Sequence, residues 1–137
     1  MALPILVTLA GCEKDVAEPE GCYTLSVKKE GVVVFLTEPY TVEAGLSISF
    51  ENCGKADFYS FFPGTPGHVY SEYIDPEDTT TTGQDTNTSG DISVTYSNPG
   101  DYLATMLLTN REVGNPDNYT ELVMNFTIKV TEPAEEK

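Results

Sequence analysis

Apolar and polar residues alternate with a period of two along most of the chain after residue 22. Leu46, Ile48 and Phe50, for example, alternate with two serines, as one face of a half-buried strand requires. Gly- and Pro-containing turns separate the repeats of this pattern, and no window has the period of an amphipathic helix. The predicted strands lie at 23–28, 32–36, 46–51, 58–62, 92–96, 102–108 and 122–130.

Two stretches depart from the alternation. Residues 32–36 are continuously apolar, which predicts a strand buried on both faces. Residues 75–91 contain no apolar side chain, which predicts a long solvated loop or a flexible insertion. About seven short strands with frequent turns predict an all-β fold, an antiparallel β-sandwich.

The N-terminal residues have features of a targeting signal. The apolar run 2–10 is too short for a membrane span and has the size of the core of a secretory signal. No Lys or Arg precedes it, so either the true start lies upstream or the run is not a signal. The sequence LAGC at 9–12 resembles the lipobox of bacterial lipoproteins, which implies cleavage before Cys12 and its acylation, with palmitate among the fatty acids. The alternative is a buried strand that ends in a core cysteine.

Charged residues follow Cys12 at once. Glu13-Lys14-Asp15 resembles the export signal of Bacteroidetes-type surface lipoproteins, which implies a lipid-anchored protein on the outer face of the outer membrane. The alternative is a plain solvated linker. We therefore expect a signal peptide at 1–11, a lipidated linker at 12–21, a sandwich domain at 22–131, and at 132–137 a disordered tail or the junction to a further domain.

Two phrases resemble the PKD-type immunoglobulin-like domain. One is TVEAGLSISFEN at 41–52, and the more specific one is YSNPGDYLATMLLTN at 96–110. In the second phrase Pro-Gly makes a turn, and Tyr102 enters the next strand as in a tyrosine corner. The resemblance covers residues 32–131 and implies a PKD-like sandwich. The Trp-containing phrase of that family is replaced by FYSFFPGTPGHVY at 58–70, which is similar to PKD-like domains of surface lipoproteins of unknown function.

The resemblance implies a module that supports or binds, and no catalytic residue is expected. His68 is the single histidine, and its Gly- and Pro-rich turn is a poor place to hold a general base or a zinc ion. The net charge of −15 argues against nucleic acid as a partner, because phosphate contacts need clustered cations. The lipid anchor is the expected link to the membrane.

The expected partner is an extracellular glycan, or alternatively a surface protein that the domain contacts as a structural stalk or adhesion module. Sugars bind exposed aromatic faces with polar edges. The aromatic residues near the Gly/Pro-rich turns that supply candidate sugar contacts are Tyr59, Phe61, Tyr70 and Tyr73. The alternative is that these rings fill the core.

Two further sites remain open in the sequence. Alternate oxygen-bearing side chains resemble the first half of a calcium loop at Asp85, Asn87, Ser89 and Asp91, although Tyr96 stands where the bidentate acid is expected. Such residues are also common in ordinary loops, so Ca²⁺ is one of two interpretations, and no other cofactor is expected. Cys22 and Cys53 remain after Cys12 is assigned, and they either form a disulfide in an oxidising compartment or stay apart.

Overall fold

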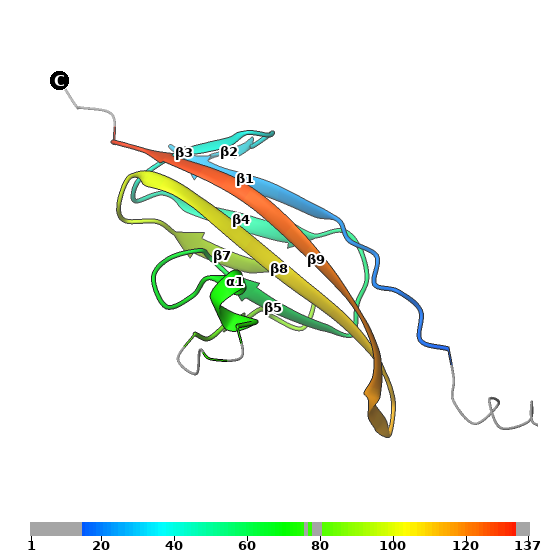
Figure 1. Ribbon diagram of the computed structural model, residues 1–137. Coiled ribbons are helices and arrows are strands. Elements are labelled where there is room, and N and C mark those ends of the chain that lie inside the picture. The colour runs from blue at the N-terminus through cyan, green and yellow to red at the C-terminus, as the bar shows by residue number, and fades with distance from the viewer. Residues whose placement is uncertain (1–14, 76, 78–80, 134–137) are drawn as a thin grey trace, which may run out of the picture.

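A computed structural model describes residues 15–75, 77 and 81–133, and it shows two β-sheets packed face to face (Figure 1). The first sheet has four strands in the order β2-β1-β4-β7. All of its neighbouring strands are antiparallel. Its strands are β1 (Tyr23–Lys29), β2 (Val32–Phe35), β4 (Ser47–Asn52) and β7 (Ile92–Thr95).

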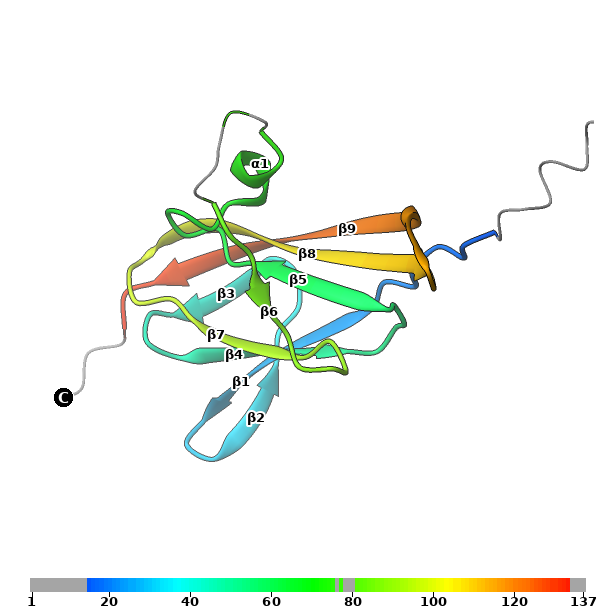
Figure 2. The ribbon, with the colours of Figure 1, turned by 90° about the horizontal axis from the view of Figure 1, so that it is seen from below.

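The second sheet has five strands in the order β3-β9-β8-β5-β6. β3 runs parallel to the end of β9, and the other pairs are antiparallel. A single helical turn, α1 (Tyr70–Tyr73), lies over the side of this sheet that faces away from the first sheet (Figure 2). The strands are β3 (Tyr40–Glu43), β5 (Phe58–Phe62), β6 (Gln84–Asp85), β8 (Gly100–Glu112) and β9 (Asn115–Thr131).

The prediction of an all-β, immunoglobulin-like sandwich is confirmed. The described residues contain nine strands where about seven were expected, and the two additional strands are β3 and β6. Both are short edge strands, and β6 lies within the polar stretch 75–91 that predicted a loop. β6 has only two polar residues and depends on its pairing with β5. β3 does alternate, with Tyr40 and Val42 between polar residues, but its four residues were too short a run to be predicted as a strand.

Aromatic rings join the two sheets in the core. Phe50 of β4 has no exposed surface, and its ring centroid lies 4.9 Å from that of Phe61 and 5.4 Å from that of Phe126. Phe61 and Phe126 belong to the opposite sheet, so this cluster spans the sandwich. Aromatic pairs in such tilted arrangements contribute about 0.5–1.5 kcal/mol beyond the burial of their area.

The expectation that residues 32–36 are buried on both faces is wrong. Val32 is 62% exposed and Phe35 is 66% exposed. β2 is an edge strand that pairs only with the C-terminal half of β1, from Ser26 to Lys29. Figure 2 shows the β1–β2 hairpin projecting from the sandwich. An apolar run shows that a strand avoids charge, but burial requires a second layer above it, and β2 has none.

The turn before β8 has the expected tyrosine corner. The Tyr102 hydroxyl donates a hydrogen bond of 2.7 Å to the backbone oxygen of Asn98, four residues upstream. The ring of Tyr102 packs against Tyr96 at 4.6 Å between centroids. The Tyr96 hydroxyl is buried and donates to the Pro63 backbone oxygen at 2.7 Å, so both tyrosines fasten loops to the sandwich.

Cys22 and Cys53 form a disulfide, with 4.9 Å between their Cα atoms. β1 and β4 are neighbours, and their pairing of Tyr23 with Asn52 brings the residue before one strand to the residue after the other. The backbone N–H of Cys53 also donates to the Cys22 oxygen at 2.9 Å. The cysteines therefore meet because of strand register, which the sequence alone left open.

The domain contacts begin before Cys22, inside the expected linker. Glu20 and Lys55 exchange two backbone hydrogen bonds of 2.8 and 2.9 Å. The backbone oxygen of Ala17 accepts hydrogen bonds from the side chains of Asn110 and Thr120 at 2.9 and 2.7 Å. The segment 15–21 is therefore part of the folded unit, whereas the expected signal peptide, Cys12 and most of the expected tail lie outside the described residues.

Removal of the disulfide is the first prediction. Replacing both Cys22 and Cys53 with serine should lower the free energy of unfolding by about 2–4 kcal/mol, because the bridge restricts the unfolded chain. Thermal and denaturant unfolding followed by circular dichroism measure this change. The Cys12→Ser variant is the control and should unfold like the parent protein; equal stability of the double variant would contradict the prediction.

Alkaline pH should destabilise the fold through two tyrosines. Burial raises the pKa of Tyr23 and of Tyr96 well above the ordinary value, and nearby Tyr59 and Asp91 (for Tyr23) and Tyr102 (for Tyr96) add to the effect. Above pH ~10 the unfolded chain loses these protons while the folded chain keeps them, so the unfolding free energy should fall as pH rises.

Denaturant unfolding at a series of alkaline pH values measures this dependence. The Tyr96→Phe variant should show a shallower decline than the parent protein, because one of the strongly proton-retaining groups is gone. Tyr119→Phe is the matched control, since it removes the hydroxyl of a tyrosine that is 50% exposed. An identical slope in all three proteins would refute the assignment to Tyr96.

Candidate functional site

The outer face of the five-stranded sheet carries the main candidate site. Side chains alternate between the two faces of a strand, and the core residues Phe61, Met106 and Leu108 define the inner face. The intervening positions of β5, β8 and β9 therefore point outward, and the strand register sets them side by side. We call this set the outer face: Phe58, Ser60 and Phe62; Thr105, Leu107, Thr109 and Arg111; Tyr119, Glu121, Val123 and Asn125.

Helix α1 covers one end of the outer face. The rings of Tyr70 and Tyr73 pack on Phe62 at centroid distances of 5.3 and 4.9 Å. They lie 6.2 Å from each other with an interplanar angle of 28°. Phe62 is 1% exposed beneath them, whereas Tyr73 is 47% exposed. A buried ring thus supports two rings that present surface to solvent.

Ring packing accounts for the helical turn at this position. The turn is only four residues long, and no side chain caps its N-terminus. Backbone bonds from Tyr73 to Val69 and from Ile74 to Tyr70 close it at 3.0 and 3.1 Å. Isolated helices of this length are unstable in water, so its stability depends on the contacts of Tyr70 and Tyr73 with Phe62.

A second aromatic group lies at the other end of the outer face. Phe58 is 54% exposed, and the guanidinium carbon of Arg111 lies 5.2 Å from its ring centroid. Tyr119, 50% exposed, stands opposite Arg111 in the β8–β9 register. Cation–π contact holds the Arg111 side chain over one face of Phe58. The outer face therefore has partly exposed aromatic rings at both ends.

The floor between the two aromatic groups is mixed in chemistry. Ser60 and Glu121 supply a hydroxyl and a carboxylate group, and Leu107 and Val123 supply aliphatic surface, whereas Thr109 is buried. Burial raises the pKa of Tyr70, with smaller contributions from Glu121 and Tyr73, which places the carboxylate of Glu121 within electrostatic reach of α1. This combination of rings, hydroxyls and a carboxylate suits a polyhydroxylated ligand.

Two of the four predicted aromatic contacts lie elsewhere. Phe61 has no exposed surface and belongs to the core. The Tyr59 hydroxyl accepts hydrogen bonds from the Asn52 side chain and the Ala56 backbone, both at 2.9 Å, so it is a structural bridge. Phe58 was missed although strand alternation could have found it, because it has the parity of Phe62 and the opposite parity to Phe61.

The geometry of the 85–91 loop favours the interpretation of its oxygen-bearing side chains as ordinary turn residues. The Asn87 side-chain oxygen accepts the backbone N–H groups of Ser89 and Asp91 at 2.9 and 2.8 Å. One Asp91 oxygen accepts the Asn52 N–H at 2.8 Å, and the backbone of Asp85 pairs with Ser60 of β5. Backbone donors therefore occupy the Asn87 oxygen and one Asp91 oxygen, and these contacts close a turn. The part of the chain that the structure describes holds no group of three or more His, Cys, Asp or Glu residues suited to a metal ion.

His68 also has a structural position. Its Nδ1 atom lies 2.9 Å from the Thr82 backbone oxygen and 3.4 Å from the Thr82 hydroxyl. This contact ties the turn after β5 to the segment that leads into β6. His68 therefore links two loops of the fold.

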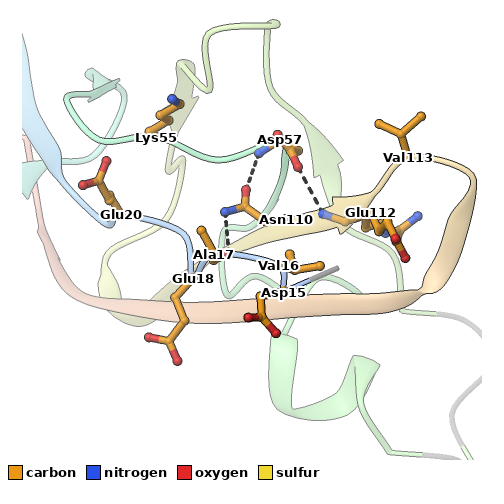
Figure 3. Close-up of a pocket in the computed structure, with 11 residues that line it drawn as sticks. Asp15, Val16, Ala17, Glu18, Glu20, Lys55, Asp57, Asn110, Glu112 and Val113 are labelled. Carbon is orange, nitrogen blue, oxygen red and sulfur yellow. Dashed lines mark hydrogen bonds between the residues drawn. The ribbon is translucent and has the colours of Figure 1, made fainter. Parts of the chain in front are cut away.

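A groove of about 580 Å³ lies where the N-terminal segment meets the β8–β9 hairpin (Figure 3). Asn110 is central to it: its side chain donates to Ala17 and accepts the Asp57 N–H at 2.8 Å, and Asp57 in turn accepts the Arg111 N–H at 3.1 Å. Acidic residues including Asp15, Glu18 and Glu112 line the rest. The polar groups at its centre are engaged in holding the chain entry, so we assign this groove a structural role.

No helix among the described residues has the length and apolar character of a membrane span.

Comparison with known proteins adds no relative from which a function can be transferred. A scan against protein-family models and searches of the curated proteins and of the solved structures found no match to this chain.

Proposed function

We propose that this protein is a non-catalytic, lipid-anchored module of the outer-membrane surface that mediates the binding of extracellular polysaccharide. The observation that carries the proposal is the pair of Tyr70 and Tyr73 rings, supported by the buried Phe62 and presented to solvent on the outer face. Sugar rings stack their C–H faces on such aromatics and hydrogen-bond at their edges.

The dimensions of the outer face favour a chain over a single sugar. Phe58 and Phe62 are four residues apart on β5, which corresponds to roughly 13 Å along the strand. The aromatic groups at the two ends therefore contact different units of an oligosaccharide. Ser60 and Glu121 between them provide hydrogen-bond partners for its hydroxyls.

The anchoring part of the proposal rests on the lipobox-like sequence before Cys12, which lies outside the described residues. Each buried CH₂ of an acyl chain contributes about 0.8 kcal/mol, so a multiply acylated cysteine holds a protein at a bilayer. The first described residues enter at the β8–β9 turn, at one end of the sandwich (Figure 1). An anchored chain would thus extend its strands away from the membrane.

The alternative is a stalk or adhesion module that contacts proteins and no glycan. The exposed apolar strand β2 favours this alternative, because an open sheet edge can pair with a strand of another protein. β2 lies on a different sheet from the outer face. The two functions predict opposite results in a glycan-binding experiment.

We expect the soluble protein lacking residues 1–12 to bind at least one polysaccharide on a glycan array. Tyr73→Ala should weaken that binding by up to about tenfold, since one ring-stacking contact contributes ~0.5–1.5 kcal/mol. Val113→Ala is the control: it removes another exposed apolar side chain, 99% exposed, from the β8–β9 turn and should bind as the parent does. Absence of binding to every glycan would reject the polysaccharide function.

We expect Cys12→Ser to abolish lipid attachment. Cells expressing the parent protein should incorporate labelled palmitate into it and hold it in the outer-membrane fraction, because acyl chains anchor the N-terminus. The Cys22→Ser variant controls for loss of a cysteine as such and should still be labelled. Equal labelling of the Cys12 variant and the parent would show that Cys12 is not the acylated residue.

A further inference from the structure

β2 is a free apolar edge. It is the first strand of the four-stranded sheet, and its side chains are exposed on both faces: Val32 62%, Val33 52%, Val34 41% and Phe35 66%. Natural β-proteins usually protect such an edge with charge, proline or a bulge, because an open edge pairs with other strands. Among the described residues, those of β2 itself carry none of these protections.

The backbone of β2 presents bonding groups outward. The N–H of Leu36 donates to Leu25 of β1 at 2.8 Å. Hydrogen-bonded and non-hydrogen-bonded pairs alternate along an antiparallel ladder, so Val34 points its backbone groups toward β1 as well. Val33 and Phe35 therefore direct their N–H and C=O groups away from the sheet, where another strand can meet them.

The charged residues around β2 favour an antiparallel partner. The turn end carries Lys28, Lys29 and Glu30, and Glu38 follows the other end. Lys29 pairs with Glu43 at 3.4 Å, while Lys28 lies on β1 opposite Val33. In an antiparallel pair of β2 strands the two charged turns lie at opposite ends of the ladder, so like charges stay apart. A parallel partner would place the two turns side by side.

The hairpin also carries little of the negative charge of the chain. The whole chain has a net charge of −15, yet residues 24–37 contain two lysines and one glutamate. Charges farther away are screened over about 8 Å at physiological ionic strength. Contact through the projecting hairpin therefore keeps the acidic bodies of two molecules apart (Figure 2).

We propose that β2 pairs antiparallel with β2 of a second copy of this protein, forming a two-fold symmetric dimer. The outward groups of Val33 and Phe35 make the new hydrogen bonds, and the apolar side chains of the two strands cover one another. The two four-stranded sheets then join into one continuous sheet. This inference goes beyond polysaccharide binding, because it uses the opposite sheet and does not depend on the outer face.

Sedimentation velocity over a wide range of concentrations tests the dimer, using the full-length chain with Cys12→Ser in every sample. The parent should convert from monomer to dimer as concentration rises. Val33→Lys should weaken dimerisation by at least about tenfold, because it places a charge against its own copy across the two-fold axis. Val113→Lys is the matched control, since Val113 is 99% exposed at the β8–β9 turn, and it should dimerise like the parent.

Hydrogen exchange on the parent protein keeps the test independent of the folding of any variant. The amides of Val33 and Phe35 should exchange more slowly at high than at low concentration, while the amide of Val34 should not change. A parent that stays monomeric at all concentrations overturns the proposal. Association that persists in Val33→Lys, or that leaves the β2 amides unprotected, also overturns it.

Discussion

The pairing of β8 with β9 is the interaction on which the other parts of the structure depend. Their ladder runs from Gly100 opposite Val130 to Arg111 opposite Tyr119, with a register shift only before Glu112. One side of this ladder supplies Met106 and other core residues, and the other side supplies most of the outer face. Its turn end holds the N-terminal segment, and its open end holds β3. A shift of one residue would exchange the core and the candidate site.

This ladder also separates the functional surfaces in space. The N-terminal segment lies along the β8–β9 turn, while the β1–β2 turn lies toward the opposite end (Figure 2). The outer face lies between these ends on one sheet, and β2 lies on the edge of the other. A ligand or partner on any one of these three surfaces would therefore leave the other two free.

Sequence patterns predicted the seven longer apolar or alternating strands but not the short edge strands β3 and β6, and the resemblance predicted the tyrosine corner at Tyr102. They did not predict what depends on a distant partner. Residues 32–36 have the composition of a buried strand, but their exposure follows from their place at a sheet edge. Tyr70 and Tyr73 were found by composition, whereas the pairing of Phe58 with Arg111 required the register between β5 and β8. The disulfide likewise required the register between β1 and β4.

The two proposals reinforce each other energetically. A shallow aromatic surface such as the outer face binds one stretch of sugar weakly, because a few stacking contacts must offset the ordering of a flexible chain. A polysaccharide repeats its units, so a dimer that presents two outer faces gains effective concentration for the second contact. Pairing through β2 leaves both outer faces free, since they belong to the sheets that do not join. Anchoring at a membrane raises the local protein concentration in the same way, which favours pairing of a short four-residue edge that would be weak in dilute solution.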